Sequence, residues 1–245
     1  MKPRCLDLFC GAGGASMGLH RAGFDVIGVD IKPQPRYPFK FIQADAMTFL
    51  LDGYDFIWAS PPCQAYSIMR NLPWLRDKEY PRLIRPVRVR LEASGIPYCI
   101  ENVMGAIHDG MVADWLCGTM FGLPFYRHRL METNWFWIRP PHPAHAVKAQ
   151  SVRNGRTMGS RARDIVFQKS AAKTNHFSSP IPVSQRGNGA QRPGAGVGHA
   201  AGIQLVREAM QIDWMTREEI TQAIPPAYSE FIGKQAIQTI SHDTL

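Results

Sequence analysis

Residues 4–14 read RCLDLFCGAGG, an apolar run followed at once by a glycine-rich turn. A short apolar run that ends in turn residues is typical of a buried strand. Amphipathic sequence with Met17 and Leu19 follows as far as Gly23, where a helix can end. This stretch therefore predicts a strand, a glycine turn and a helix, which is the first unit of an open α/β sheet.

Further strands are predicted along the chain, and each ends in polar residues. They are residues 24–30, 40–44, 56–60 and 97–102. Their spacing is typical of βαβ units, so we predict an α/β fold with a Rossmann-like, doubly wound and mostly parallel sheet. Because parallel strands end at one edge of the sheet, their polar exits should meet where such sheets bind ligands.

Helices are predicted in several further segments. They are residues 80–94, 205–212, 217–222 and 227–240. We expect the first of these to be entered through Pro81 and kinked at Pro86, because proline lacks the backbone N–H that a helix interior needs. Its arginines are expected on solvated faces: Arg82, Arg85, Arg88 and Arg90.

Composition indicates an α/β domain with a small additional region, in a chain of 245 residues. The five cysteines are scattered and odd in number, so we expect reduced thiols. His142 and His145 are too few for four ligands, and no metal site is predicted. We find neither a secretory leader nor an apolar run of about eighteen residues, so we expect a cytoplasmic protein without a membrane partner.

Basic residues concentrate in one part of the chain. Residues 138–205 hold ten Lys or Arg against one acid, whereas the other eighteen basic and nineteen acidic residues nearly balance. The ten are Arg139, Lys148, Arg153, Arg156, Arg161, Arg163, Lys169, Lys173, Arg186 and Arg192. Such a distribution indicates a polyanion-binding surface, with a solvated loop as the alternative.

A glycine turn with an acid after the second strand is typical of nucleotide-cofactor sites. Gly11 and Gly13 let the backbone approach a cofactor, and Asp30 can accept hydrogen bonds from ribose hydroxyls. Nicotinamide, flavin and adenosylmethionine enzymes all use this arrangement. The F-x-G-x-G-G pattern, together with a further acid at Asp45, favours S-adenosylmethionine.

The residues after the fourth strand indicate covalent chemistry. Cys63 follows Pro61-Pro62 directly, in a stiff loop on the ligand edge of the predicted sheet. Glu101-Asn102 leave the neighbouring strand at the same edge. A nucleophile and an acid can therefore converge on one small ring.

Six segments resemble the signature motifs of C5-cytosine methyltransferases, in that family's order. They are DLFCGAGG (7–14), PCQ (62–64), ENV (101–103), RHR (127–129), REAMQ (207–211) and AIPP (223–226). The resemblance spans residues 4–137 and 205–240. The region between them, which reads the target sequence in the family, is short here.

The resemblance implies methyl transfer from S-adenosylmethionine to C5 of a flipped-out cytosine in double-stranded DNA, by a monomer in a bacterial or phage-infected cell. Cys63 would be the nucleophile, Glu101 would contact the ring nitrogen and amine, Arg129 would contact the base, and Arg127 would hold the loop or a phosphate. The implied cofactor-binding residues are Phe9, Gly11, Ala12, Gly13, Asp30, Ile31, Asp45, Ala46, Pro62, Gln222 and Ala223.

The resemblance also implies a division of the chain into 1–137 for catalysis and cofactor binding, 138–204 for target recognition, and 205–245 for the return to the catalytic domain. The sequence departs from the family at three places. Asp30 replaces a glutamate, Phe125 a glutamine, and Thr221-Gln222 a Gly-Asn pair.

Three alternatives stay open. One branch of the family modifies tRNA with the same nucleophile, so the substrate can be RNA. A catalytically silent DNA-binding homologue would keep the fold without the reaction. A nicotinamide-dependent enzyme is the weakest alternative, because it leaves Cys63-Gln64 unexplained.

Overall fold

The computed structural model describes residues 2–67, 77–123, 125–144, 150–153, 156–159 and 206–242. The chain forms two compact units. Unit 1 comprises Met1–Trp115, Arg129–Arg139 and Ala223–Leu245, and unit 2 comprises Leu116–His128 and Pro140–Gln222.

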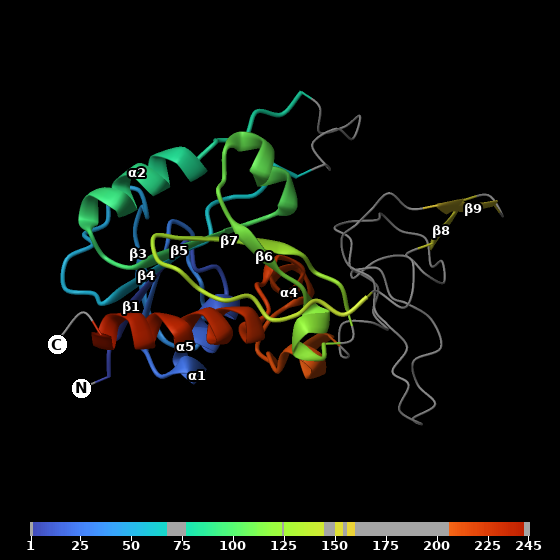
Figure 1. The fold of residues 1–245 in the computed structure, drawn as a ribbon. Helices are drawn as coiled ribbons and strands as arrows, with labels where there is room; N and C mark the ends of the chain where they lie inside the picture. Colours follow the sequence, from blue (N-terminus) through green and yellow to red (C-terminus); the bar gives the residue numbers. More distant parts are fainter. Residues whose placement is uncertain are drawn as a thin grey trace. The chain divides into compact units, whose positions relative to one another are not determined.

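A seven-stranded sheet runs in the order β3-β2-β1-β4-β5-β7-β6 (Figure 1). Its strands are β1 (Arg4–Leu8), β2 (Asp25–Asp30), β3 (Lys40–Gln43), β4 (Phe56–Ala59), β5 (Tyr98–Asn102), β6 (Asp114–Leu116) and β7 (Arg129–Thr133). The pairs from β3 to β5 are parallel, and β7 runs antiparallel to β5. The predicted Rossmann-like, mostly parallel fold is confirmed.

The central strands are buried along almost their whole length. In β1 every residue after Arg4 has low exposure, and all four residues of β4 are buried. When helices cover both faces of a parallel sheet, side chains on both faces of its strands are buried, so the strands read as continuous apolar runs. This is why they were recognisable in the sequence.

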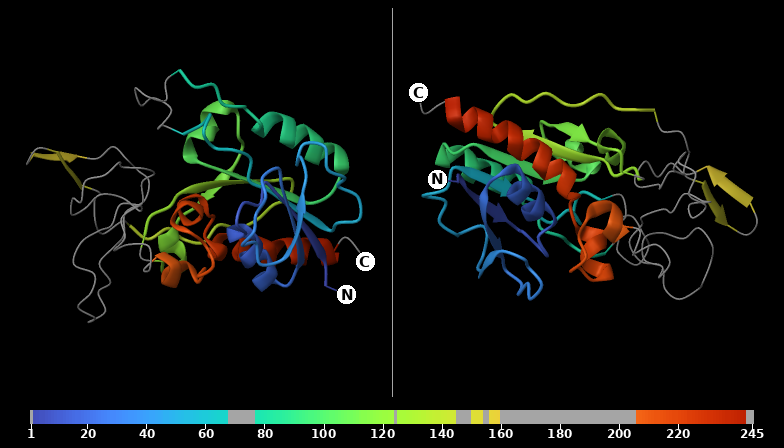
Figure 2. Two further views of the ribbon diagram at one scale, coloured as in Figure 1. Left: turned by 180° about the vertical axis from the view of Figure 1, so that it is seen from behind. Right: turned by 90° about the horizontal axis from the view of Figure 1, so that it is seen from below.

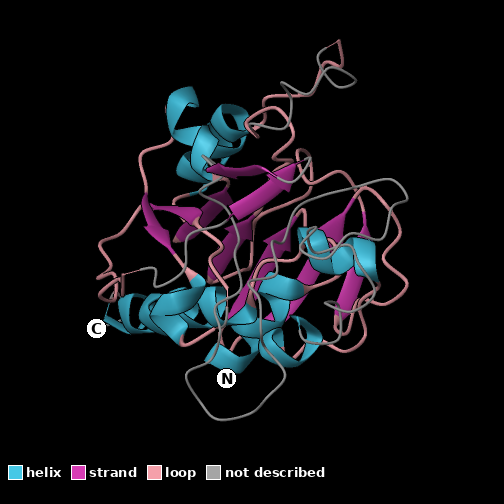
Figure 3. Cartoon of the chain, turned by 90° about the vertical axis from the view of Figure 1, so that its right-hand side faces the viewer, coloured by secondary structure: helices cyan, strands magenta, loops and turns pink. Residues whose placement is uncertain are grey.

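Helices cover both faces of this sheet (Figures 1 and 2). Helices α1 (Gly14–Ala22) and α5 (Pro226–His242) pack together on one face, and α2 (Ile84–Ser94) lies on the other. Figure 3 shows the strands between these helical layers.

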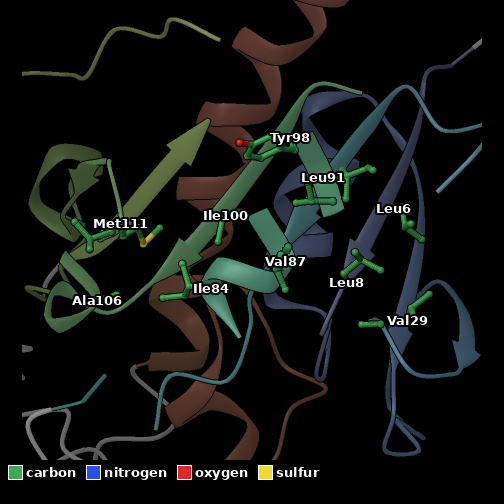
Figure 4. Packing of buried hydrophobic residues seen from close by; sticks show 14 of the residues in the cluster. Leu6, Leu8, Val29, Ile84, Val87, Leu91, Tyr98, Ile100, Ala106 and Met111 are labelled. Carbon is green, nitrogen blue, oxygen red and sulfur yellow. The ribbon is translucent and has the colours of Figure 1, made fainter. Parts of the chain in front are cut away.

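Helix α2 contributes one apolar stripe to the core (Figure 4). Its buried residues are Ile84, Val87 and Leu91, which are spaced so that they share one face of a helix. They belong to one buried cluster with Leu8 and Ile100 of the sheet. Burial of this stripe fixes α2 against the sheet.

The predicted start and kink of this helix were wrong. Helix α2 begins at Ile84, so Pro86 lies in its first turn, where a backbone N–H has no helical partner in any case. The Tyr66 hydroxyl accepts a hydrogen bond from the backbone N–H of Ile84 at 3.1 Å. One N–H group of the first helical turn is thus bonded by a side chain 18 residues away in the sequence.

The predicted solvated face also needs correction at two arginines. Arg88 forms a bidentate ion pair with the buried Glu132, and its Nη2 lies 2.7 Å from Oε2 of that residue. Arg90 donates to the carbonyl oxygen of Ala46 at 2.9 Å. Only Arg82 and Arg85 are exposed as predicted.

Several elements were not predicted at all. Two of them are the short strands β6 and β7. The others are β8 (Gln150–Arg153) and β9 (Arg156–Gly159), which pair antiparallel as a hairpin. Helix α4 (Arg217–Gln222) matches its prediction, and residues 206–210 are helical within the predicted 205–212.

Among the residues that the structure describes, no helix is long and apolar enough to cross a membrane.

The contact between α1 and α5 depends on Gly18. A Cβ atom there would overlap the carbonyl oxygen of Pro226 and Oγ of Ser229. Ser229 is buried and donates to the carbonyl oxygen of Ala15 at 2.8 Å, so neither partner can easily withdraw.

We expect Gly18→Ala to lower the free energy of unfolding by about 1–3 kcal/mol, a typical cost of overpacking. Helix propensity alone would instead raise the free energy of unfolding of Gly18→Ala, since alanine is about 1 kcal/mol more favourable than glycine in a helix. Urea denaturation of the variant and the wild type measures the sign. Equal or greater stability of the variant would contradict the close packing of α1 on α5.

Candidate functional site

The carboxyl ends of neighbouring strands are held level by backbone hydrogen bonds just beyond the strands. The N–H of Cys10 donates to the carbonyl of Val29, and the N–H of Ser60 donates to the carbonyl of Leu8, each at 3.1 Å. The exits of β1, β2 and β4 are therefore in register. Their polar residues lie at one edge of the sheet, as predicted.

The glycine turn after β1 is built from left-handed backbone. Phe9, Gly11 and Gly13 have φ angles of 59°, 50° and 88°. The N–H of Gly11 donates to Oδ2 of Asp30 at 3.0 Å. A Cβ atom on Gly11 would meet no atom within 4 Å, so the turn borders open space.

The carboxylate of Asp30 is fixed but keeps acceptor capacity. Its Oδ1 accepts from the N–H of Lys32 at 2.9 Å, and Oδ2 accepts from Gly11. A carboxylate has about four acceptor positions, so two stay available. Ile31 beside it is 64% exposed, and Asp45 lies just beyond Ala44, whose N–H donates to the Asp30 carbonyl. An acid beside an exposed apolar side chain fits a ribose with an attached flat ring.

The other predicted cofactor residues are divided between the two units. Three have low or intermediate exposure in unit 1: Ala12, Ala46 and Pro62. Ala223 is also in unit 1, with its Cβ 3.1 Å from the place that a Cβ on Gly14 would occupy. Gln222, at the end of α4, belongs to unit 2.

The loop that carries Cys63 is anchored to the neighbouring strand. Nδ2 of Asn102 donates to the carbonyl oxygen of Pro61 at 2.9 Å. The carbonyl of Cys63 accepts from the N–H groups of Tyr66 and Ser67, each at 3.0 Å, which forms a tight turn. Cys63 itself is half-buried at the start of this turn.

A glycine supports the same turn from the other side. Gly105 lies in a 3-10 helix, η2 (Met104–Asp109), and a Cβ atom on it would overlap the carbonyl oxygen of Tyr66. The backbone of η2 therefore touches the Cys63 turn directly. This contact restricts where the turn can lie.

Glu101 and Arg129 form a buried ion pair. Nε of Arg129 lies 3.0 Å from Oε1 of Glu101, and the residues are 9% and 4% exposed. They come from the antiparallel strands β5 and β7, in which Glu101 lies opposite Met131. The structure thus brings together two residues that the motifs placed 28 positions apart in the sequence.

Arg127 is held by the backbone of unit 2. It is 2% exposed, and its Nη2 donates to the carbonyl oxygen of Thr221 at 3.1 Å. Phe125, which stands where the family has a glutamine, is buried with 1% exposure. Two of the positions that depart from the family thus have a role in unit 2: Phe125 is buried there, and the backbone of Thr221 holds Arg127.

Most of the predicted basic surface lies outside the described residues. Arg139 is described: it forms an ion pair with Asp114 at 3.1 Å, and its guanidinium lies 4.4 Å from the ring centre of Trp115. Arg153 and Arg156 are at the ends of β8 and β9. Arg139 is thus engaged within unit 1.

A buried polar chain beneath the glycine turn was not predicted. The Tyr37 hydroxyl donates to Oγ of Ser16 at 2.7 Å, and Ser16 donates to Oδ2 of the fully buried Asp7. Burial raises the pKa of Asp7 to about 7, although the hydrogen bond from Ser16 opposes this. Gly28 leaves room for the Tyr37 ring, and this glycine inside an apolar strand was the available signal.

The chain is similar to known proteins in its fold and in part of its sequence. The structure resembles the crystal structure of an E. coli protein described as a DNA modification methyltransferase encoded within a prophage, with a TM-score of 0.53, 16% identity, and coverage of 98% of this chain and 99% of that one. At this identity the likeness shows the fold alone, which is a Rossmann-like, mostly parallel sheet.

Residues 3–109 match the family model of C-5 cytosine-specific DNA methylases. The type II methyltransferase M.FnuDI of Fusobacterium nucleatum is 28% identical over 120 residues, which are 42% of this chain and 33% of that protein. M.XorII of Xanthomonas oryzae pv. oryzae is 29% identical over 123 residues, 42% of this chain and 29% of that protein. The match spans about a third of these relatives, and the predicted resemblance is confirmed for that segment.

We expect Asp7→Asn to change how stability depends on pH. The ordinary pKa of an aspartate is about 3.9, so between about pH 4 and 7 folded Asp7 keeps a proton that the unfolded chain releases. Wild-type stability therefore loses this contribution as pH rises through that window and levels off above about pH 7. Asparagine cannot ionise, so the variant should gain stability relative to wild type as pH rises.

Urea denaturation across this pH range measures the difference. Asp25→Asn removes an exposed carboxylate from the neighbouring strand and controls for the loss of one charge. A constant difference between wild type and Asp7→Asn would show that Asp7 ionises normally.

Proposed function

We propose that this chain transfers a methyl group from S-adenosylmethionine to C5 of cytosine in DNA. The observation that carries the proposal is the meeting of three features at one edge of the sheet in unit 1: the glycine turn with Asp30, the anchored Cys63 loop, and the buried Glu101–Arg129 pair. The match of residues 3–109 to C-5 cytosine-specific DNA methylases supports it.

Cys63 is proposed as the nucleophile because its thiol is held in a tight turn at the ligand edge. Cytosine C5 is a poor nucleophile until a thiolate adds to C6, which moves an electron pair toward C5 and N3. C5 then takes the methyl group that the cofactor supplies. Loss of the C5 proton to a base and departure of the Cys63 thiolate restore the aromatic ring.

Glu101 and Arg129 would stabilise the charge that develops on the ring. Glu101 would hydrogen-bond or protonate N3 and contact the exocyclic amine, while Arg129 would contact O2. Their ion pair at 3.0 Å holds both groups in place before the base arrives. Preorganised contacts of this kind are typically worth about 3–4 kcal/mol in the transition state.

The glycine turn and Asp30 are proposed to bind the cofactor. Gly11 borders open space, and Asp30 keeps two acceptor positions for ribose hydroxyls. Exposed Ile31 would contact the adenine, and Asp45 would accept from its amino group. We propose that Ala223, which is also in unit 1, contributes to the site near the methionine end of the cofactor.

The substrate is proposed to be double-stranded DNA bound by a monomer. A stacked base cannot reach Cys63, so the cytosine must flip out at a cost of a few kcal/mol. Residues 138–204 would supply the phosphate and base contacts that offset this cost. RNA as the substrate is the competing outcome of the test below.

We expect duplex DNA in which every cytosine is replaced by 5-fluorocytosine to become covalently joined to Cys63 in the presence of S-adenosylmethionine. Fluorine cannot leave as a cation, so elimination is blocked after methyl transfer and the adduct persists. Full substitution removes the need to know the target sequence. Denaturing electrophoresis and peptide mapping locate the adduct.

Cys63→Ser should abolish the adduct, because a serine hydroxyl is far less ionised than a thiol. Cys99→Ala, which changes a cysteine in the core, is the matched control and should leave it intact. Attachment at another cysteine would overturn the nucleophile assignment. An adduct with fluorinated RNA alone would assign the RNA branch.

We expect Asp30→Ala to weaken S-adenosylmethionine binding at least tenfold, because two ribose hydrogen bonds to a charged group are lost and each is worth about 1.5–3 kcal/mol. Isothermal titration calorimetry measures the affinity. Asp25→Asn at the exposed start of the same strand is the control. Unchanged affinity in a folded Asp30→Ala protein would contradict the cofactor assignment.

A further inference from the structure

Three potential metal ligands meet in unit 2, outside the residues proposed for methyl transfer. Cys117 follows β6 directly, His128 precedes β7, and His142 lies in the stretch beyond Arg139. One ligand atom from each of the three lies within 4.8 Å of the others. All three residues belong to the same compact unit, so their arrangement is internal to it.

These separations are close to those of a bound ion. Zinc bonds of about 2.0–2.1 Å to histidine and about 2.3 Å to cysteine place tetrahedral ligand atoms about 3.3–3.6 Å apart. Small rotations of the two imidazoles would close the remaining difference. The rings of His128 and His142 have centroids 5.5 Å apart and are tilted by 58°, so they are adjacent without stacking face to face.

The sulfur of Cys117 has a hydrogen-bond donor beside it. Its Sγ accepts a hydrogen bond from the Thr119 hydroxyl at 3.4 Å, and the residue is fully buried. Cys117 also begins the short helix η3 (Gly118–Phe121). Hydrogen bonds donated to a ligating sulfur orient it and stabilise its negative charge. The two histidines are partly exposed, which leaves a path for an ion to enter.

We propose that Cys117, His128 and His142 bind a divalent transition-metal ion, with zinc as the ion that suits them best. One thiolate and two imidazoles are ligands that favour zinc over magnesium or calcium, which require oxygen ligands. A water molecule or another donor completes the tetrahedron. The sequence predicted no metal site, and this proposal reverses that prediction.

The ion would join three segments that are separate in the sequence. It would tie the start of η3 to the segment before β7 and to the first residues beyond Arg139. His128 stands between Arg127 and Arg129 in the chain, so coordination of His128 limits the motion of the backbone on both sides of it. The role is structural, and none of the three ligands is a residue proposed for methyl transfer.

Cobalt(II) is the probe that tests this site in the full-length protein after chelator treatment. We expect one equivalent to bind and to produce a sulfur-to-cobalt charge-transfer band together with the intense visible bands of tetrahedral cobalt. Added zinc should bleach both. Absence of the charge-transfer band in folded protein would overturn the proposal.

Variants assign the ligands. Cys117→Ser should abolish the charge-transfer band, and His128→Asn and His142→Asn should each weaken cobalt binding at least tenfold. His108→Asn and Cys99→Ala, on η2 and in the core, are matched controls and should bind as wild type does. A band that survives Cys117→Ser would place the metal at another cysteine and contradict the site.

Folding is monitored by circular dichroism. His142 is half-exposed, so we expect His142→Asn to fold. This variant can therefore decide the test if Cys117→Ser fails to fold. Zinc should also raise the melting temperature of wild type and not of His142→Asn, because an ion that binds only the native state stabilises it. An equal shift in both proteins would contradict the assignment.

Discussion

The polarity and register of the parallel strands is the constraint on which the candidate site depends. Hydrogen bonds that continue past the strands, such as Cys10 to Val29 and Ser60 to Leu8, hold their exits at one level. A shift of one residue would turn every side chain of a strand to the opposite face. The contact of Gly11 with Asp30 would then be lost, because it joins residues that leave neighbouring strands at the same height.

Buried charge marks the same edge of the sheet. Glu101 is almost fully buried, and desolvating a carboxylate costs several kcal/mol unless a partner compensates for it. Arg129 provides that partner from the antiparallel strand β7. Asp7 is also buried, its carboxylate accepts a hydrogen bond from the Ser16 hydroxyl, and there the cost of desolvation appears as a pKa raised to about 7.

The sequence predicted those elements whose signal is local. Strand β1, the glycine turn and α1 were recognisable because apolar runs and glycines are contiguous. The start of helix α2 was misplaced, because the side chain that bonds its first N–H group, that of Tyr66, comes from outside the segment. Strand β7 was missed since its charged residues, Arg129 and Glu132, find partners only in the folded chain. The cluster around Cys117 was missed for the same reason: its ligands lie 11 and 14 residues apart and form no recognisable spacing.

The departures from the family motifs fall where backbone groups supply the contacts. Arg127 is held by the carbonyl oxygen of Thr221, which any residue at that position would offer. Asp30, although one methylene shorter than glutamate, still reaches the N–H of Gly11. Cys63, Glu101 and Arg129 would act through side-chain atoms that no other residue reproduces at those positions. The residues that this chain has at Asp30 and Thr221 are therefore compatible with the proposed reaction, whereas a substitution of Cys63, Glu101 or Arg129 would remove a reacting or charge-stabilising atom.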